Sequence, residues 1–306
     1  MVAAGLLLVD KPGGITSHDV VARSRRALGT RKVGHAGTLD PMATGLLVLG
    51  VEGATRLLTF IVGLDKTYEA TIRLGVATDT DDADGTVIST TDASGLESER
   101  IGEGIAALTG RISQVPSTYS AIKVDGRRAY DLARAGEEVQ LNERDVTVSR
   151  FDVLAERRGA AGAETNGPDA AGGVDLDVVV ECSSGTYIRS LARDLGRALG
   201  VGGHLTALRR TRIGPFGVDS AASVDGIGAA TLLNPGAAAA AVLARFDVTD
   251  DEARDLRHGK RLAGAAERLP GVPAAAIDPR GALVGIVEPR GADVKSVMNM
   301  PEEGSR

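Results

Sequence analysis

The sequence predicts an α+β fold built on a large mixed, mostly antiparallel sheet flanked by helices. Residues 66–75 alternate between apolar and polar side chains, which is typical of a strand with one buried face. Residues 16–29 have the pattern of a helix, with Thr16 or Ser17 as its N-cap and Gly29 as its stop. Strands and helices mix without a strict β–α–β period, which favours the α+β class over a parallel α/β sheet.

The other elements follow in chain order from apolar runs, alternation and glycine stops. They are predicted as strands at 5–12 and 45–51, a helix at 53–63, a turn and strand at 82–90, a helix at 101–110, a strand, turn and short helix at 118–136, a strand at 174–181 and a helix at 187–200.

Two stretches interrupt this order. Residues 158–173 are small and polar, which predicts a disordered loop insertion between two strands. Alanines favour a helix within 226–244, but the segment "NPG" at 234–236 is predicted to interrupt it. We therefore predict a large domain at 1–240 and a small β-rich domain at 241–306.

The cysteine content and the length of the apolar runs indicate where in the cell the protein is expected. The chain has one cysteine, Cys182, so no internal disulfide can form, and a reducing cytoplasm is the expected location. Its apolar runs are too short to span a bilayer, and the N-terminus lacks the pattern of a signal peptide. We expect a cytoplasmic protein with no membrane partner.

The net charge of −6 is unevenly distributed along the chain. Residues 182–217 hold six arginines and one acid (6 − 1 = +5), whereas residues 61–110 hold three basic residues and ten acids (3 − 10 = −7). Phosphates respond to charge within a Debye length of about 8 Å, so an acidic chain with basic segments can bind a polyanion. The alternative for an arginine run is a solvated helix face, and it stays open here.

The sequence holds no pattern for a metal or a common cofactor. The four histidines are far apart and there is one cysteine, so no zinc site is predicted. It contains no glycine-rich phosphate loop, and the acidic stretch 79–85 fits a turn better than a calcium loop. Aromatic residues make up 3% of the chain, which does not favour a stacking platform for single strands. We expect neither metal nor cofactor.

One stretch, "GHAGTLDPMATGLL" at 34–47, is predicted to be a loop with unusual chemistry. Asp40 is its only acid, Pro41 favours an extended backbone at Asp40, and His35 lies in the same stretch. An inert Asp-Pro turn is the simplest interpretation. A lone carboxylate among small residues also fits a nucleophile or a general base, and the residues alone leave these alternatives open.

Seven stretches occur together in one order: "GLLLVDKPGGITSHDVV", "RKVGHAGTLDPMATGLL", "DKTYEATIRLG", "TDTDDADG", "VPSTYSAIKVDGRRAYDLAR", "CSSGTYIRSLARDLG" and "HLTALRRTRIGPF". They resemble the motifs of the bacterial TruB family of tRNA pseudouridine synthases and extend over about residues 5–218. The tail resembles the small PUA-like C-terminal domain of some members. The resemblance implies a pseudouridine synthase catalytic domain at 1–240 and a PUA-like RNA-binding domain at 241–306.

The resemblance also implies a reaction, in which uridine 55 in the T loop of tRNA is flipped out and isomerised to pseudouridine. Asp40 matches the catalytic aspartate, which acts on the sugar as a nucleophile at C1′ or as a base at C2′. Arg189 matches the arginine that pairs with this carboxylate, and Tyr68 matches the tyrosine that stacks on the base and helps to move the C5 proton. The residues expected to bind substrate are Lys11, His35, Tyr187, Leu208, Arg209 and Arg210.

The expected partner is the T arm of tRNA, with no protein partner required, and the chain is expected to be a monomer. Two alternatives stay open. One is a tRNA-binding or tRNA-folding factor in which catalysis is secondary. The other is an aspartate-dependent nucleoside hydrolase, which is less favoured because such sites normally need several acids. Pseudouridine in the product, rather than free uracil, distinguishes a synthase from a hydrolase.

Overall fold

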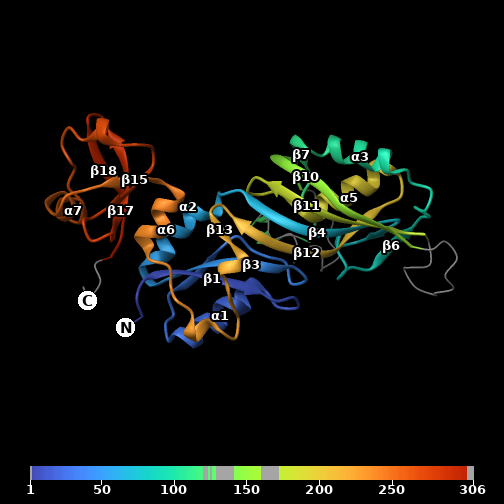
Figure 1. Ribbon diagram of the computed structural model, residues 1–306, viewed down its shortest axis with the longest axis horizontal. Helices are drawn as coiled ribbons and strands as arrows, with labels where there is room; N and C mark the ends of the chain where they lie inside the picture. Colours follow the sequence, from blue (N-terminus) through green and yellow to red (C-terminus); the bar gives the residue numbers. More distant parts are fainter. Residues whose placement is uncertain (1, 120–122, 125, 129–140, 160–171, 302–306) are drawn as a thin grey trace. The chain divides into compact units, whose positions relative to one another are not determined.

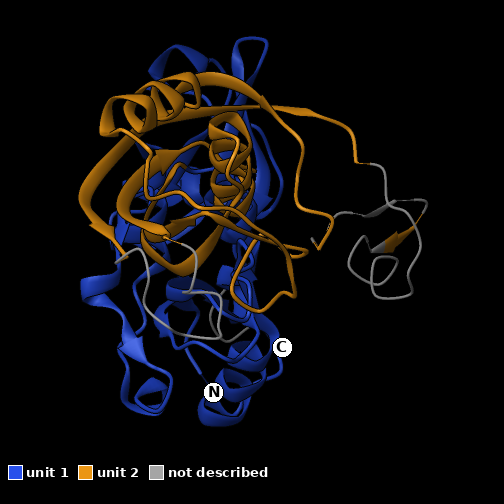
Figure 2. Cartoon of the chain, turned by 90° about the vertical axis from the view of Figure 1, so that its right-hand side faces the viewer, with its two compact units in different colours: residues 1–64, 212–306 blue, residues 65–211 orange. Residues whose placement is uncertain are grey.

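The computed structural model describes residues 2–119, 123–124, 126–128, 141–159 and 172–301 (Figure 1). The chain divides into two compact units, residues 1–64 with 212–306 and residues 65–211 (Figure 2). The predicted short helix near 130–136 lies outside the described residues, as does most of the predicted loop insertion at 158–173. The predicted domain boundary at residue 240 stays a prediction.

The first unit is built on β1 (Gly5–Lys11) and β3 (Thr44–Val51), which pair antiparallel along their whole length. A third strand, β2 (Val33–Ala36), also pairs antiparallel with β3. The short β14 (Ala222–Ser223) runs parallel to β1. The predicted strands at 5–12 and 45–51 are therefore confirmed.

Different elements cover the two faces of this sheet. The side chains of Leu7 and Val9 pack on one face with α1 (Ser17–Leu28). The side chains of Leu6 and Leu8 point to the other face and pack with α6 (Pro235–Val242) and the C-terminal sheet. Helix α1 begins and ends as predicted, because Thr16 forms a capping box with Asp19 and Gly29 adopts the left-handed conformation.

Two helix predictions in this unit need correction. The predicted helix at 53–63 begins as a 3-10 helix, η1 (Glu52–Leu57), and becomes α-helical only in α2 (Leu58–Val62). The segment at 234–236 starts helix α6 rather than interrupting one. The Asn234 side chain accepts hydrogen bonds from two N–H groups of the first turn, and Pro235 occupies a position where its missing N–H is not needed.

The C-terminal part of the first unit is a four-stranded sheet with one helix, which confirms the predicted small β-rich domain. Its strand order is β15 (Ala244–Asp247), β16 (Ala274–Ile277), β17 (Leu283–Arg290) and β18 (Asp293–Asn299), and only the first pair is parallel. Helix α7 (Asp250–Arg257) starts with a capping box at Thr249. The remaining short elements are β13 (Phe216–Gly217), η2 (Val218–Ser220), η3 (Ile227–Ala229) and η4 (Ala266–Arg268).

The second unit contains a sheet with the strand order β12 (Gly203–Ile213), β4 (Lys66–Leu74), β11 (Val174–Cys182), β10 (Arg144–Arg158) and β7 (Gly110–Gln114). Helices α3 (Ser98–Ala107) and α5 (Ile188–Leu199) contact each other and lie on the same face of this sheet (Figure 1). The described part of this unit also contains two small hairpins, β5 (Val76–Thr78) with β6 (Val87–Thr90) and β8 (Lys123–Val124) with β9 (Arg127–Arg128).

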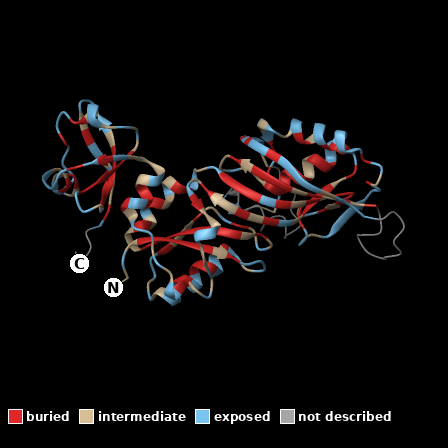
Figure 3. Ribbon diagram, viewed as in Figure 1, coloured by how far each residue is buried: buried red, intermediate tan, exposed pale blue. Residues whose placement is uncertain are grey.

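Burial follows the predicted alternation in this sheet. In β4, Tyr68, Ala70, Ile72 and Leu74 are buried while Glu69 between them is exposed. Figure 3 shows buried residues gathered along the strands and exposed residues on the outer faces of the helices. The α+β class with a mixed, mostly antiparallel sheet is confirmed.

Candidate active site

The loop that carries Asp40 is shorter than predicted. Residues 33–36 and 44–51 are paired strands, so the loop proper spans 37–43. The prediction that His35 lies in a loop was therefore wrong, because it lies on β2. The small residues around it carried no strand signal, although they pair with β3, the next strand along the chain.

Both chain neighbours of Asp40 are held by hydrogen bonds. The Ser17 hydroxyl accepts a bond from the N–H of Leu39 (2.9 Å) and donates one to the carbonyl of the same residue (3.2 Å). On the other side, the carbonyl of Pro41 accepts a bond from the N–H of Gly14 (2.9 Å). Asp40 itself is half-buried. Its backbone is thus fixed on both sides of a partly accessible carboxylate.

Lys11 holds the same loop from inside the protein. It is fully buried, and its Nζ donates to the carbonyls of Pro12 (2.9 Å), Ile15 (2.7 Å) and Pro41 (3.2 Å). A buried ammonium group is tolerated when its donors are hydrogen-bonded, and these three acceptors meet that need. The contacts join Lys11 to the Asp40 loop, while its predicted role in substrate binding stays a prediction.

His35 has a second imidazole beside it. Its ring and that of His18 lie edge to face, with centroids 5.4 Å apart and an angle of 83° between the planes. His18 belongs to the first turn of α1 and is exposed, whereas His35 is half-buried. The pairing places a second polar ring next to the predicted substrate-binding histidine.

Arg189, the second residue of α5, is buried and its guanidinium is fixed by the second unit. Nη1 donates to the carbonyl of Thr80 (2.9 Å) and to the hydroxyl of Ser117 (3.2 Å), and Nη2 donates to the carbonyl of Tyr119 (2.8 Å). Nε lies 3.5 Å from a carboxylate oxygen of Asp82. These contacts leave the guanidinium little freedom to reorient.

The acidic turn at 79–85 has a structural role that the sequence analysis missed. Besides Asp82, it supplies Asp81, which pairs with Arg193 of α5 at 3.2 Å. Burial raises the pKa of the Asp81 carboxyl, and the positive charge of Arg193 opposes this shift. The opposite charges of residues 61–110 and 182–217 were a signal that the two segments meet.

Tyr187 is positioned through its backbone. The side-chain amide of Gln114 accepts a bond from the N–H of Tyr187 (2.8 Å) and donates one to its carbonyl (3.1 Å). Gln114 is buried at the end of β7, and Tyr187 is the N-cap of the helix that carries Arg189. Gln114 therefore fixes the start of α5, and the sequence analysis did not identify it.

The other predicted residues of the second unit lie on β4 and β12. Tyr68 and Leu208 are both buried, and Tyr68 faces Val180 across the β4–β11 pair. Arg209 is half-buried, whereas Arg210 is 1% exposed. That burial does not favour a phosphate contact by Arg210, and its substrate-binding role stays a prediction.

Two buried cations influence each other in this sheet. Burial, together with the charge of Arg210, lowers the pKa of Lys66 to about 8. Cys182, opposite Lys66 on β11, is also buried, and burial raises the pKa of its thiol to about 11. A thiol with that pKa is protonated near neutral pH, which does not favour Cys182 as a nucleophile.

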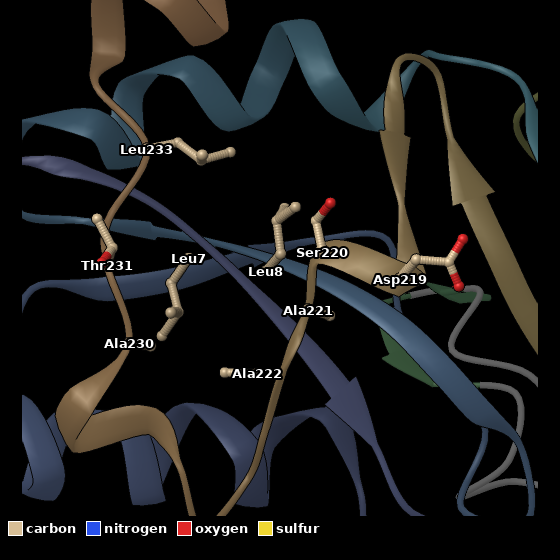
Figure 4. A pocket seen from close by; sticks show the side chains of 9 residues that line it. All are labelled: Leu7, Leu8, Asp219, Ser220, Ala221, Ala222, Ala230, Thr231 and Leu233. Atoms are coloured by element: carbon tan, nitrogen blue, oxygen red, sulfur yellow. The ribbon is translucent and has the colours of Figure 1, made fainter.

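A cavity of about 400 Å³ lies elsewhere in the first unit. Figure 4 shows Leu7 and Leu8 of β1 between two lining stretches, residues 219–222 on one side and Ala230, Thr231 and Leu233 on the other. Its lining includes none of the predicted site residues. Among the described residues, no three His, Cys, Asp or Glu side chains lie together as a metal site, and no helix is long and apolar enough to cross a membrane.

Three protein-family models match this sequence, and together they extend over residues 25–301. The model described as "TruB family pseudouridylate synthase (N terminal domain)" matches residues 25–188, more than half of the chain. The chain belongs to the TruB family. Two C-terminal models of the same family match residues 189–245 and 243–301.

Individual TruB relatives are similar along almost their full length. A tRNA pseudouridine synthase B from Leifsonia xyli subsp. xyli is 56% identical, and the match covers 99% of this chain and 98% of the relative. A protein of the same name from Arthrobacter sp. is 54% identical over 96% of both chains. A solved structure, "Structure of H/ACA RNP bound to a substrate RNA containing 2'-deoxyuridine", matches with 24% identity and a TM-score of 0.68, covering 98% of this chain and 86% of that chain. This likeness supports the fold.

The predicted TruB site residues fall into two sets. Lys11, His35 and Asp40 belong to the first unit. The second unit holds Tyr68, Tyr187, Arg189, Leu208, Arg209 and Arg210. The catalytic and substrate-binding roles of both sets, including the pairing of Asp40 with Arg189, stay predictions.

Proposed function

We propose that this chain isomerises uridine 55 in the T loop of tRNA to pseudouridine. The main observation behind this proposal is the position of Asp40 in a chain of the TruB family. Its carboxylate is half-buried, and the residues before and after it are held by hydrogen bonds. Relatives more than 50% identical over nearly the whole chain bear the name tRNA pseudouridine synthase B. The alternative of a folding factor with secondary catalysis is less well supported.

The reaction balances without an added reactant. The bond between C1′ and N1 of uridine breaks, a bond between C1′ and C5 forms, the hydrogen leaves C5, and N1 gains a proton. The carboxylate of Asp40 acts on the sugar, either at C1′ as a nucleophile or at C2′ as a base. This isomerisation oxidises nothing and consumes no water, so our expectation of no cofactor is consistent with it.

The other residues serve this step by orientation and charge. Arg189, whose guanidinium is fixed by contacts to Thr80 and Ser117, is assigned by the family resemblance to favour the charged form of the catalytic carboxylate. Tyr68 stacks on the flipped base and helps to move the C5 proton. Base flipping is needed because the target uridine is stacked within the folded T loop.

The test is incubation of the protein with an unmodified tRNA transcript, followed by mapping of pseudouridine at each position. We expect modification at position 55 and none with Asp40→Asn. Release of free uracil would instead indicate a hydrolase, and modification at another position would contradict the assigned substrate. We further propose that the protein acts as a monomer in the cytoplasm, and sedimentation at working concentration tests the oligomeric state.

A further inference from the structure

Ser17 occupies an unusual position relative to Asp40. Its hydroxyl is bonded to both backbone groups of Leu39, the residue before Asp40. Ser17 is 1% exposed and Leu39 is 4% exposed, so neither group exchanges easily with water. A hydroxyl donates one hydrogen bond and accepts others, which allows a single side chain to satisfy both groups of Leu39.

These two hydrogen bonds satisfy the backbone N–H and carbonyl of Leu39, which a neighbouring strand would satisfy if Leu39 lay in a sheet. Leu39 lies in the loop at 37–43, between the end of β2 and the start of β3. Ser17 is the first residue of α1, whose N-terminus is fixed by the Thr16 capping box. The hydroxyl therefore connects a rigid helix to the residue that precedes the carboxylate.

We propose that Ser17 is a positioning residue for Asp40, an inference that rests on the proposed function. Losing the hydroxyl would release Leu39 and let the Asp40 backbone shift, while Gly14 and Lys11 still hold Pro41. A displacement of about 1 Å in a reacting group can cost about 100-fold in rate. The effect is therefore expected in the chemical step rather than in RNA binding.

Helix α1 provides a matched control. Ser24 is also fully buried, and its hydroxyl donates to the carbonyl of Val20 within the same helix (2.8 Å). Ser17→Ala and Ser24→Ala remove the same atom from the same helix at the same depth. They differ in whether the lost bond reaches the Asp40 loop.

The experiment measures kcat, KM and the melting temperature of both variants on a T-arm stem-loop, with Asp40→Asn in parallel. We expect Ser17→Ala to lower kcat about 10- to 100-fold while KM stays within about twofold of wild type. Ser24→Ala should leave kcat within about twofold, and its melting temperature shows how much of any change comes from stability alone. Ser17→Cys, which keeps a weak hydrogen-bonding group in a slightly larger side chain, should lower kcat by less than Ser17→Ala.

Three results would overturn the proposal: equal kcat for the two alanine variants, a Ser17→Ala effect confined to KM, or loss of folding in Ser17→Ala with normal kcat in Ser17→Cys. If Ser17→Ala is normal and Asp40→Asn is inactive, the positioning role alone fails. If Asp40→Asn is active, the proposed function fails first.

Discussion

The carboxylate of Asp40 sits between two residues whose backbone groups are bonded to the segment from Lys11 to Ser17. The contacts that fix these neighbours come from the Ser17 hydroxyl, the Gly14 N–H and the Lys11 ammonium group, whereas the proposed reaction is assigned to the carboxylate. This separation between holding the loop and carrying out the reaction lets each be tested by a different substitution.

For Asp40→Asn we expect the rate of pseudouridine formation to fall at least about 1,000-fold, because the amide keeps the shape but is a poor nucleophile and base. Binding of T-arm RNA should stay within about threefold of wild type, since removing a negative charge does not weaken attraction to a polyanion. Filter binding and pseudouridine mapping measure the two quantities. Loss of binding together with activity would make Asp40 a structural residue of the RNA site.

The lowered pKa of Lys66 predicts how the stability of the protein depends on pH. Its pKa is lowered from 10.5 to about 8, so between these values the unfolded chain holds a proton that the folded chain has released. The free energy of unfolding contributed by Lys66 is therefore lowest below about pH 8 and rises as the pH increases towards 10.5. Lys66→Met should be more resistant to urea than wild type at pH 7, and this advantage should shrink between pH 8 and 10.5. An advantage that grows across this range would contradict the assignment.

At the scale of elements, the start of α5 depends on Gln114. Replacing Gln114 by Met keeps the volume but leaves the N–H of Tyr187 without this partner, so we expect about 1–3 kcal/mol of lost stability. Urea unfolding measures the loss. Ser113→Ala on the same strand is the control, because Ser113 is exposed and bonded to the exposed Glu143, and its effect should be within about 0.5 kcal/mol. Equal losses in the two variants would show that Gln114 does not hold α5.

Elements with local signals were predictable from the sequence. The limits of α1 follow from Thr16 and Gly29, and the buried face of β4 follows from a period of two. Strand β2 was not predictable, since its stability comes from pairing with residues 48–51 across an intervening loop. A short run containing glycine and alanine carries no strand signal of its own.

The same distinction holds at the candidate site. The motif around Asp40 predicts the carboxylate as the candidate, but the polar groups that fix its neighbours are dispersed in the sequence. Ser17 reaches Leu39 across 22 positions, and Gln114 reaches Tyr187 across 73. Such contacts depend on the tertiary fold and leave no local pattern.

For the molecule as a whole, charge is divided between internal pairing and exposed surface. The second unit uses Asp81 and Asp82 of its acidic stretch to hold Arg193 and Arg189 of its basic one. The arginines of the basic segment are thus not equivalent as RNA contacts, and their exposure distinguishes them.

We expect Arg209→Ala and Arg212→Ala to weaken T-arm binding, and the slope of log affinity against log salt to shrink by about 0.7 to 0.9 for each lost phosphate contact. Both side chains are half-buried, whereas Arg210 is buried, so Arg210→Ala should mainly reduce stability. Arg100→Ala, an exposed residue of α3, is the control and should leave the slope unchanged. An unchanged slope for Arg209→Ala and Arg212→Ala would show that these arginines face solvent and do not contact phosphate.

The first unit is formed by two separate stretches of the chain, residues 1–64 and 212–306, and this affects the order in which the units can fold during translation. Residues 65–211 are continuous, so they leave the ribosome as a complete unit, whereas β1 and β3 must wait for the residues that finish their core, from Ile213 to Met300. The strands on either side of the Asp40 loop therefore stay incompletely packed until translation is almost finished. In a nascent chain, the core that packs against these strands would be completed only when Met300 has been added, after residues 65–211 are already available to fold.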